Sequence, residues 1–191
     1  MPSPQHQVLT WVIPVIRRRT EVHDPEQVRH DVLAAQADAD PAPPRRVARA
    51  FDVRRREAFG MPVFELRPRG GEPRRTVLYL HGGGFVSGLD RLHWRYAARL
   101  VRDLGVRVVL PSYPLAPTHT WRDALPRLVE LFDELAGEVD GPSAEGVVLV
   151  GDSAGGGLAV SLAQLTTGQS TGPRPTHLVV FAPWLDLTGR T

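Results

Sequence analysis

Apolar and polar positions follow two different periods along this chain. Short, nearly continuous apolar runs, which are typical of strands buried on both faces of a sheet, are followed by longer stretches in which apolar residues recur every three or four positions, as in amphipathic helices. The expected strands are 76–81, 106–111, 146–151 and 177–183, and the expected helices are 92–104, 121–135 and 154–166. This alternation predicts βαβ units, and therefore an α/β protein with a mostly parallel, doubly wound sheet.

The N-terminal part of the chain has helical periodicity in two stretches, residues 5–19 and 25–37. Asp24 followed by Pro25 is a favourable start for the second helix, because aspartate caps helix N-termini and proline is tolerated at the first helical position. The prolines that come after this helix predict a connector. We therefore expect residues 1–45 to form a helical segment that precedes the main domain.

A hairpin is expected between this segment and the βαβ units. Residues 47–53 and 61–68 have the composition of strands, and Gly60 lies between them at the position of a turn. Together with the strands and helices that follow, this hairpin makes up the second predicted unit, an α/β core over residues 46–191.

The composition is that of an ordinary globular domain, and it narrows the chemistry. Of 191 residues, 42% are hydrophobic and 23% are charged, with a net charge of +2. The chain has no cysteine, which excludes disulfides, thiolate metal sites and a cysteine nucleophile, and which fits a cytoplasmic location. Arginine occurs in short runs without interleaved aromatic residues and lysine is absent, so no nucleic-acid partner is expected.

The apolar run at residues 8–16 is too short to span a bilayer, and it contains Pro14. Positive charges follow this run instead of preceding it, which is the reverse of a secretory signal. The sequence therefore predicts no stable insertion into a membrane.

The first candidate for chemistry is Ser153, in the segment Gly-Asp-Ser-Ala-Gly at 151–155. The segment fits the pattern G-x-S-x-G, and it has the context that this pattern requires, with an apolar strand before it and a helix after it. The flanking glycines allow a sharp turn that exposes the serine at the carboxyl edge of the sheet. The serine also lies at a helix N-terminus, where backbone N–H groups favour developing negative charge.

A glycine run from His81 to Gly84 follows the first of the expected parallel strands. Such a run lets the backbone approach a ligand closely and leaves N–H groups unshielded, as an oxyanion hole for acyl transfer requires. A phosphate-binding loop is the alternative. The Walker pattern is excluded because the chain has no lysine, and a dinucleotide fold would carry an acidic residue at the end of the next strand, where this chain has Pro111.

Four motifs resemble, in this order, the hormone-sensitive-lipase-like branch of the α/β-hydrolases, which contains the bacterial family IV carboxylesterases. They are His81-Gly-Gly-Gly84, Tyr113-Pro-Leu-Ala-Pro117, Gly151-Asp-Ser-Ala-Gly-Gly156 and Pro183-Trp-Leu-Asp186. The resemblance covers essentially the whole chain and implies an α/β-hydrolase fold, with residues 1–45 as an N-terminal helical cap over the active site. One departure is Thr118, which stands where the family usually has a glutamate.

The resemblance also implies roles for individual residues. Ser153 matches the nucleophile, which would form an acyl-enzyme without a metal or another cofactor. Three residues match the backbone N–H donors of the oxyanion hole: Gly83, Gly84 and Ala154. His81 and Asp152 flank these donors and are expected to shape the two loops. The implied substrate is a small-molecule carboxylic ester.

The acid and the histidine of a catalytic triad are harder to find. In α/β-hydrolases the order along the chain is nucleophile, acid, histidine, whereas Ser153 is followed here by His177 and then by Asp186. His177 opens a strand, so we expect it roughly 16 Å from the level of the nucleophile, and a general base must come within about 3 Å. Asp186 matches the family's Pro-Trp-x-Asp turn and not its catalytic acid.

Two other histidines, His93 and His119, follow parallel strands but are expected on helix surfaces or in solvent. The family's acid and histidine come from segments that would follow residue 191. The sequence thus resembles the N-terminal portion of an esterase, without the C-terminal strands and helices of the fold.

Two functional hypotheses remain. The first is a serine carboxylesterase that acts through Ser153. The alternative is a catalytically inactive, hydrolase-like ligand-binding protein or a fragment without function, because the triad acid and histidine are absent. In either case the strand at 177–182 would be an apolar edge of the sheet without protecting charges, so self-association through it is expected.

Overall fold

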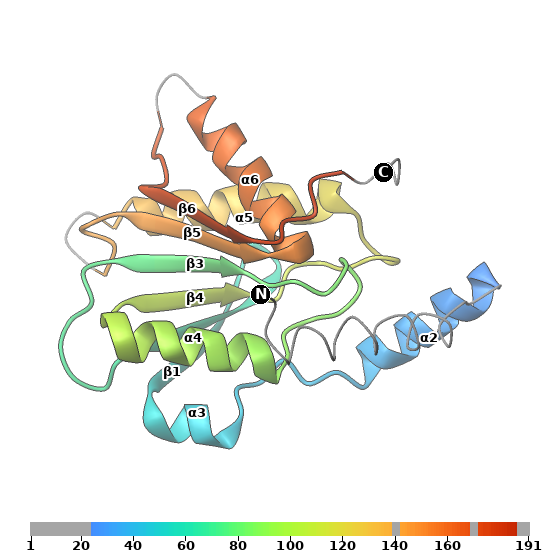
Figure 1. The fold of residues 1–191 in the computed structure, drawn as a ribbon, viewed down its shortest axis with the longest axis horizontal. Coiled ribbons are helices and arrows are strands. Elements are labelled where there is room, and N and C mark those ends of the chain that lie inside the picture. Colours follow the sequence, from blue (N-terminus) through green and yellow to red (C-terminus); the bar gives the residue numbers. More distant parts are fainter. Residues whose placement is uncertain (1–23, 139–141, 169–171, 187–191) are drawn as a thin grey trace, which may run out of the picture.

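In the computed structural model, which describes residues 24–138, 142–168 and 172–186, a six-stranded sheet runs through the centre of the molecule (Figure 1). The strand order is β1-β2-β4-β3-β5-β6; β1 and β2 are antiparallel to their neighbours, and the other strands are parallel to one another. The strands are β1 (Asp52–Ala58), β2 (Met61–Arg67), β3 (Thr76–Leu80), β4 (Arg107–Pro111), β5 (Val147–Asp152) and β6 (His177–Phe181). The helices are α2 (Pro25–Ala37), α3 (Arg45–Ala50), α4 (Arg91–Leu104), α5 (Trp121–Ala136) and α6 (Ser153–Thr167).

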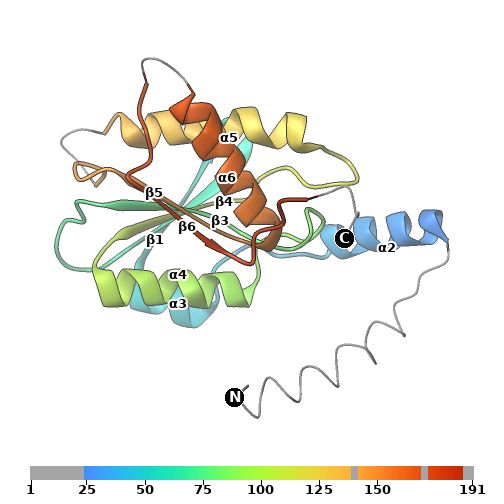
Figure 2. The same cartoon turned by 45° about the horizontal axis from the view of Figure 1, so that its top comes forward.

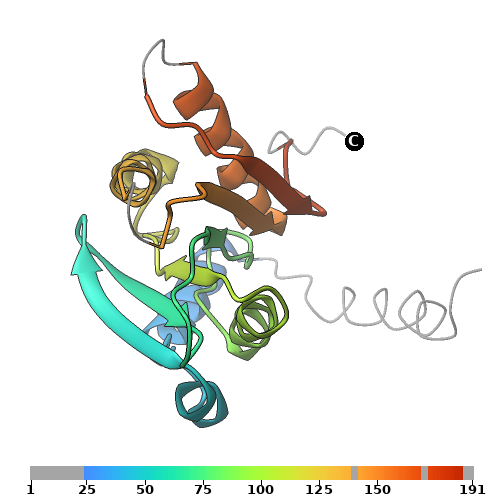
Figure 3. The ribbon, with the colours of Figure 1, turned by 90° about the vertical axis from the view of Figure 1, so that its left-hand side faces the viewer.

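Helices cover both faces of the sheet, as the alternation of periods predicts. Figure 2 and Figure 3 show α3 and α4 on one side and α5 and α6 on the other. Each face has its own apolar core, one built around Leu128 and Phe132 of α5 and the other around Trp94 of α4, whose ring lies edge-on to Phe64 at 5.4 Å. Every residue of β3 and β4 is buried, which explains why both strands are apolar without alternation after their first residues, Thr76 and Arg107.

The chain places β4 on one side of β3 and β5 on the other. From β3 it passes through α4 to β4, and from β4 it passes through α5 to β5, which pairs with β3 on the opposite side from β4. In open α/β sheets such a point, where the strand order reverses, is where ligands bind, at the carboxyl ends of the strands. The glycine run after β3 and the Ser153 turn after β5 therefore begin at adjacent strand ends.

Most elements expected from the sequence are present, with one correction. Residues 47–53 were expected to be a strand, but α3 occupies Arg45–Ala50 and β1 begins only at Asp52. Val47 and Phe51 are both buried against the α4 core, and a spacing of four residues brings them to one face of a helical turn. The expected helix at 5–19 lies outside the described residues.

The hairpin between β1 and β2 turns at Phe59 and Gly60, which have φ of 52° and 69°. Positive φ at both central residues is the requirement of a type I′ turn, the tight turn whose twist matches the strands it joins. The turn near Gly60 is therefore where the sequence predicts it.

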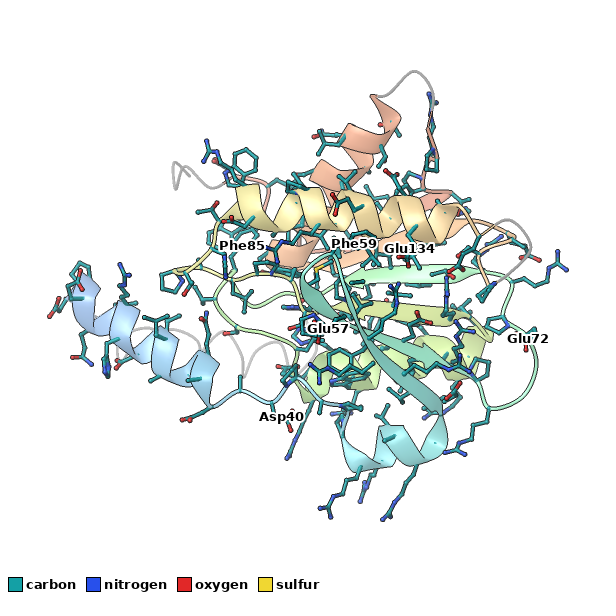
Figure 4. All side chains as sticks on the ribbon, turned by 180° about the vertical axis from the view of Figure 1, so that it is seen from behind. Asp40, Glu57, Phe59, Glu72, Phe85 and Glu134 are labelled. Carbon is teal, nitrogen blue, oxygen red and sulfur yellow. The ribbon has the colours of Figure 1, made fainter. Side chains whose placement is uncertain are left out.

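Helix α2 begins after Asp24, whose carboxylate accepts a hydrogen bond from the first turn, as expected. The helix has no buried residue and projects from the body of the molecule (Figure 1, Figure 4). It is attached near its C-terminal end, where Gln36 Nε2 donates to the carbonyl oxygens of Val86 and Ala116, both at 2.7 Å. None of the helices within the described residues combines the length and the apolar character that a membrane span needs.

A buried ionic network lies at the amino ends of β3 and β4. Arg107, which is 1% exposed, donates to Thr76 Oγ1 at 2.9 Å and to Glu138 Oε2 at 2.6 Å. Glu65 on the neighbouring β2 lies 3.7 Å from the same guanidinium and accepts a hydrogen bond from Arg67 at 2.8 Å. Burial opposes ionisation of Glu65, but these arginines outweigh it and lower the pKa of its carboxyl below the ordinary value.

Candidate active site

Ser153 stands at the junction of β5 and α6 with φ of 50°, a left-handed backbone conformation that is uncommon for any residue except glycine. The turn is tight because α6 passes directly beside the end of β3. A Cβ atom at Gly155 would overlap the carbonyl oxygens of Leu80 and His81, so only glycine fits there. Ser153 is partly exposed, whereas Ala154 after it is buried.

The glycine run after β3 forms a loop with an unusual backbone. Gly83 and Gly84 have φ of 120° and 62°, and Phe85 continues with 63°. The carbonyl oxygen of Gly83 accepts hydrogen bonds from the N–H groups of Val86 and Ser87, at 3.1 and 2.9 Å, which close the loop on itself. A Cβ atom at Gly83 would lie 2.5 Å from the carbonyl oxygen of Ser87, so the loop cannot accept a side chain at that position without moving.

Asp152 connects this loop to the Ser153 turn. Its Oδ1 atom accepts hydrogen bonds from the hydroxyl of Tyr79 at 2.8 Å and from the backbone N–H of Gly82 at 3.0 Å. Tyr79 lies on β3 and Gly82 in the loop, so one carboxylate bonds to two groups that are far from it in sequence. The structure thus brings Asp152, the glycine loop and Ser153 together at one edge of the sheet.

His81 is fully buried at the start of the loop. Its ring stacks on Tyr113 with 4.3 Å between ring centroids, and its Nδ1 lies 2.8 Å from the carbonyl oxygen of Gly82. Burial lowers the pKa of His81 to about 4, so the ring is neutral at pH 7. A carbonyl only accepts, so Nδ1 carries the proton and donates to Gly82, while Nε2 is buried without a hydrogen-bond partner.

The segment after β6 also returns to the Ser153 turn. The backbone N–H of Trp184 donates to the carbonyl oxygen of Ser153 at 2.8 Å, and the Trp184 ring lies 5.8 Å from that of Phe85 in the glycine loop. The Nε1 atom of Trp184 donates to the carbonyl oxygen of Asp186 at 2.8 Å. The Pro-Trp-Leu-Asp motif therefore packs beside the turn through its backbone and its indole ring.

His177 is not brought to Ser153. It opens β6, where it pairs with Val148, while Phe181 at the other end of β6 pairs with Asp152. At about 3.3 Å per residue, the steps from His177 to Phe181 amount to roughly 13 Å along the strand. The imidazole therefore lies at the amino edge of the sheet, opposite to the edge that carries Ser153.

The expectation for His93 was wrong. Its side chain is only 12% exposed, with its ring 5.4 Å from His81 and 6.2 Å from Tyr79. His93 Nδ1 also accepts the backbone N–H of Asp90 at 3.0 Å, which completes a reciprocal cap at the start of α4. The sequence suggested a surface position because the histidine falls in the first turn of a helix, and that turn packs against the glycine loop.

Two adjoining cavities lie beside the loop and the first turns of α5 and α6, with volumes of about 230 and 520 Å³. Both are lined by Phe85, Trp121 and Leu158, and His119 borders the smaller one. Figure 4 labels Phe85 at this end of the molecule. No pattern in the sequence singles out Trp121 or Leu158, because they approach the glycine loop only through the packing of the two helices.

In the part of the chain that the structure describes, no group of three or more His, Asp or Glu side chains is arranged to hold a metal ion. The carboxylate of Asp152, the residue before Ser153, is hydrogen-bonded to the hydroxyl of Tyr79 and to the backbone N–H of Gly82.

Comparisons with known proteins give a consistent result. Residues 77–191 match a family model described as the alpha/beta hydrolase fold. An ethyl acetate hydrolase from Pseudomonas putida is 35% identical over 147 residues, which cover 71% of this chain and 44% of that protein. The hormone-sensitive lipase of Mus musculus is 34% identical over 106 residues, covering 53% of this chain and 14% of that protein.

A solved structure of an esterase from the bacterial hormone-sensitive lipase family superposes with a TM-score of 0.65 at 26% identity. The superposition covers 97% of this chain and 59% of that one. The chain spans less than half the length of the curated relatives it matches.

Proposed function

The chain belongs to the α/β-hydrolase fold family, within its hormone-sensitive-lipase-like branch, and from that premise we propose that it is a serine hydrolase of carboxylic esters. Ser153 is the proposed nucleophile: its Oγ attacks the ester carbonyl, the alcohol leaves, and an acyl-enzyme forms that water then hydrolyses. The observation that carries the proposal is the placement of Ser153 at positive φ on the first residue of α6, beside the glycine loop.

The proposed oxyanion hole consists of the N–H groups of Gly83, Gly84 and Ala154. The first turn of a helix has N–H groups without intrahelical partners, and the helix dipole adds partial positive charge there. Ala154 lies in this turn of α6, and the bond between Gly82 and Asp152 holds the glycine loop against it. These groups are suited to the negative charge that develops on the carbonyl oxygen during acyl transfer.

The substrates we propose are small, largely apolar esters. Both cavities at the loop share the side chains of Phe85, Trp121 and Leu158, which offer no charge to a ligand. Such surfaces favour the hydrocarbon part of an ester through the loss of apolar area from water. The relative from Pseudomonas putida is named as a hydrolase of ethyl acetate, an ester of this kind.

Within the described ranges, neither His177 nor His81 is placed to act as the general base of this site. His177 lies at the opposite edge of the sheet, and His81 is fully buried, with Nδ1 bonded to Gly82 and its ring stacked on Tyr113. We propose that this chain, by itself, hydrolyses activated esters only at the level left when triad members are removed, about 10³ to 10⁴ over water. The same observation favours the second candidate function, a hydrolase-like protein that binds small esters without turning them over.

The experiment that separates these candidates is labelling of the purified chain with a fluorophosphonate, followed by peptide mapping. Labelling at Ser153 that is absent in Ser153→Ala supports the serine hydrolase. Ser161→Ala is a matched control, because Ser161 lies on the same helix with its hydroxyl bonded to the carbonyl of Gly157. A folded protein that stays unlabelled at Ser153 but binds ethyl or p-nitrophenyl esters supports the binding protein instead.

Two further proposals concern the surroundings of the site. We propose that the helical segment 1–45 acts as a cap, because Gln36 bonds to Val86 in the glycine loop and to Ala116 in the turn after β4. Limited proteolysis in the presence and absence of a bound ester tests this proposal, since a cap that covers a ligand should be cleaved more slowly when the ester is bound. The cytoplasmic location stays a prediction from the lack of cysteine.

We also propose that copies of this chain associate through residues 177–182. Leu178, Val179 and Phe181 of β6 are 40%, 41% and 46% exposed, and β6 is the last strand in the sheet order. An exposed apolar edge strand is a template for pairing with another chain. Size-exclusion chromatography of Val179→Lys against the unchanged chain tests the proposal, and a monomer in both cases contradicts it.

A further inference from the structure

Among the described helices, four begin after a polar residue that can cap them, and Asp152 before α6 behaves differently from the other three. In those three, a side-chain oxygen accepts a backbone N–H of the first turn, as caps do. They are Asp24 before α2, Asp90 before α4 and Thr120 before α5. Asp152 has the extended backbone of a cap, with φ of −118° and ψ of 144°, yet its side chain makes no bond to its helix.

The carboxylate of Asp152 points to β3 and the glycine loop instead. Tyr79 donates its hydroxyl hydrogen and Gly82 its backbone N–H to the same oxygen. Tyr79 is 3% exposed, and burial together with Asp152 raises the pKa of its hydroxyl, which therefore remains protonated and able to donate. The other carboxylate oxygen fills the space where a Cβ atom at Gly82 would be, so only glycine leaves room for this arrangement.

The direction of this side chain matters for the proposed chemistry. A capping side chain bonds to the N–H of the second or third helical residue, which in α6 are Ala154 and Gly155. The Ala154 N–H is one of the proposed oxyanion donors. If Asp152 capped α6, its carboxylate would occupy that donor and would place a negative charge next to the charge that develops on the ester oxygen.

We propose that Tyr79 and the Gly82 N–H hold the Asp152 carboxylate away from the first turn of α6, which leaves the Ala154 N–H free for the oxyanion. Tyr79 is then a positioning residue that acts through Asp152 and never touches the substrate. The proposal rests on the proposed function, because it assigns a role to Tyr79 within the same site. Its structural half, the direction of the carboxylate, can be tested without any activity.

The structural half is tested by the amide proton shifts of the ¹⁵N-labelled whole chain. In the unchanged protein we expect the Gly82 amide to carry the hydrogen-bond shift, so that Asp152→Ala moves Gly82 upfield and leaves Gly155 in place. In Tyr79→Phe we expect Ala154 or Gly155 to move downfield as the carboxylate turns to the helix. If Asp152→Ala shifts Ala154 or Gly155 upfield and leaves Gly82 unchanged, the carboxylate already caps α6 and the proposal is wrong.

The matched control is Tyr96→Phe. The ring of Tyr96 lies edge-on to Tyr79 at 5.2 Å, and within the described residues its hydroxyl makes no hydrogen bond to Asp152. Both variants remove one hydroxyl and keep the ring, so a general loosening of this cluster would affect them alike. We expect only Tyr79→Phe to move the amides at the start of α6.

The functional half is tested by the rate constant of fluorophosphonate labelling at Ser153. Loss of a whole oxyanion donor costs about 10² to 10³-fold, so competition for one donor in Tyr79→Phe is expected to slow labelling by roughly tenfold or more. Tyr96→Phe is expected to label at the normal rate. Because Tyr79 acts through Asp152, Tyr79→Phe should have no further effect in an Asp152→Ala background.

The outcomes separate this inference from the proposed function. A chain that is never labelled at Ser153 contradicts the proposed function, while the amide shifts still decide where the Asp152 carboxylate lies. A Tyr79→Phe protein that is labelled as fast as the unchanged chain overturns the role of Tyr79. If Tyr79→Phe also slows the labelling of the Asp152→Ala protein, the proposed role of Tyr79 is overturned as well, because its hydroxyl would then act without Asp152.

Discussion

The two ends of the parallel strands are built from different chemistry. At the amino ends, Arg107 is buried among Thr76, Glu65 and Glu138, with every charge facing an opposite one. At the carboxyl ends, a neutral His81 is buried at the start of the glycine loop, and the backbone is in the left-handed region at Gly83, Gly84 and Ser153.

This difference shows that the amino ends of the strands stabilise the fold, whereas the carboxyl ends carry strained backbone conformations. Paired buried charges hold the amino ends in one arrangement, and their loss leaves an uncompensated charge. A left-handed backbone at a residue other than glycine costs about 1 to 3 kcal/mol and persists only where the surroundings enforce it. We therefore expect substitutions at the amino ends to lower stability without affecting Ser153, and substitutions at the carboxyl ends to do the reverse.

The largest effect is expected for Arg107→Met. Glu65 and Glu138 would lose a buried partner, and breaking such a pair costs about 3 to 5 kcal/mol of unfolding free energy. Urea denaturation measures the loss. The control is Arg99→Met, which removes an exposed pair with Asp103 and should cost under about 1 kcal/mol. A change in the labelling rate of folded Arg107→Met would contradict the expectation that substitutions at the amino ends do not affect Ser153.

Gly84→Ala is expected to have the next largest effect, chiefly on the chemistry, because alanine at a φ of 62° adds backbone strain of about 1 to 3 kcal/mol that displaces the proposed donor. A Cβ atom at Gly84 has space, with Val86 Cγ2 at 3.9 Å as its only close neighbour, whereas one at Gly83 would strike the backbone of Ser87. Disturbing an oxyanion donor lowers the labelling rate at Ser153 by about 10² to 10³-fold, or roughly 3 to 4 kcal/mol. Unchanged labelling in a folded Gly84→Ala would mean that the donors are elsewhere.

The pH dependence of stability should separate the two ends as well. The pKa of His81 is lowered from 6.5 to about 4, so the unfolded chain binds a proton that the folded chain excludes, and stability is lost as the pH falls from 6.5 to 4. A shift of this size corresponds to about 3 kcal/mol.

The pKa of Glu65 is also lowered, so its contribution is present above its ordinary value of 4.5 and is lost only as the pH falls below that. As the pH is lowered, urea titrations should first show the step in unfolding free energy that comes from His81, and then the acidic step from Glu65. A His81→Asn protein, if folded, should lose that step and keep the acidic one. A single step in the unchanged chain, confined to pH below 4.5, would contradict the burial of a neutral His81.

The smallest effect is expected for Ser143→Ala at the amino ends. Ser143 Oγ accepts from Arg107 at 3.0 Å and donates to Thr76 at 2.9 Å, and the arginine keeps its other partners when the hydroxyl is removed. The expected cost is about 1 kcal/mol in urea denaturation, with normal labelling of Ser153. A loss as large as that of Arg107→Met would show that the network acts as one unit.

Local pattern was enough to predict much of the fold. The helix at 25–37, its cap at Asp24 and the turn near Gly60 are where the sequence places them, because each depends on residues within a few positions of one another. The failures are α3, predicted as a strand, and His93, expected at the surface. In both, the deciding contacts come from the α4 core or from the glycine loop, which short-range periodicity does not report.

The sequence alone determined the α/β class, the succession of strands and helices from residue 76 onward, and the positions of Ser153 and the glycine run at strand ends, because turn chemistry and apolar period are local. Only the tertiary structure decided that β3 and β5 are neighbours, and with them that Tyr79 meets Asp152 across 73 positions of sequence. The physical reason is that hydrogen bonds between distant residues depend on strand order and register, which are set by burying the whole sheet between its helices.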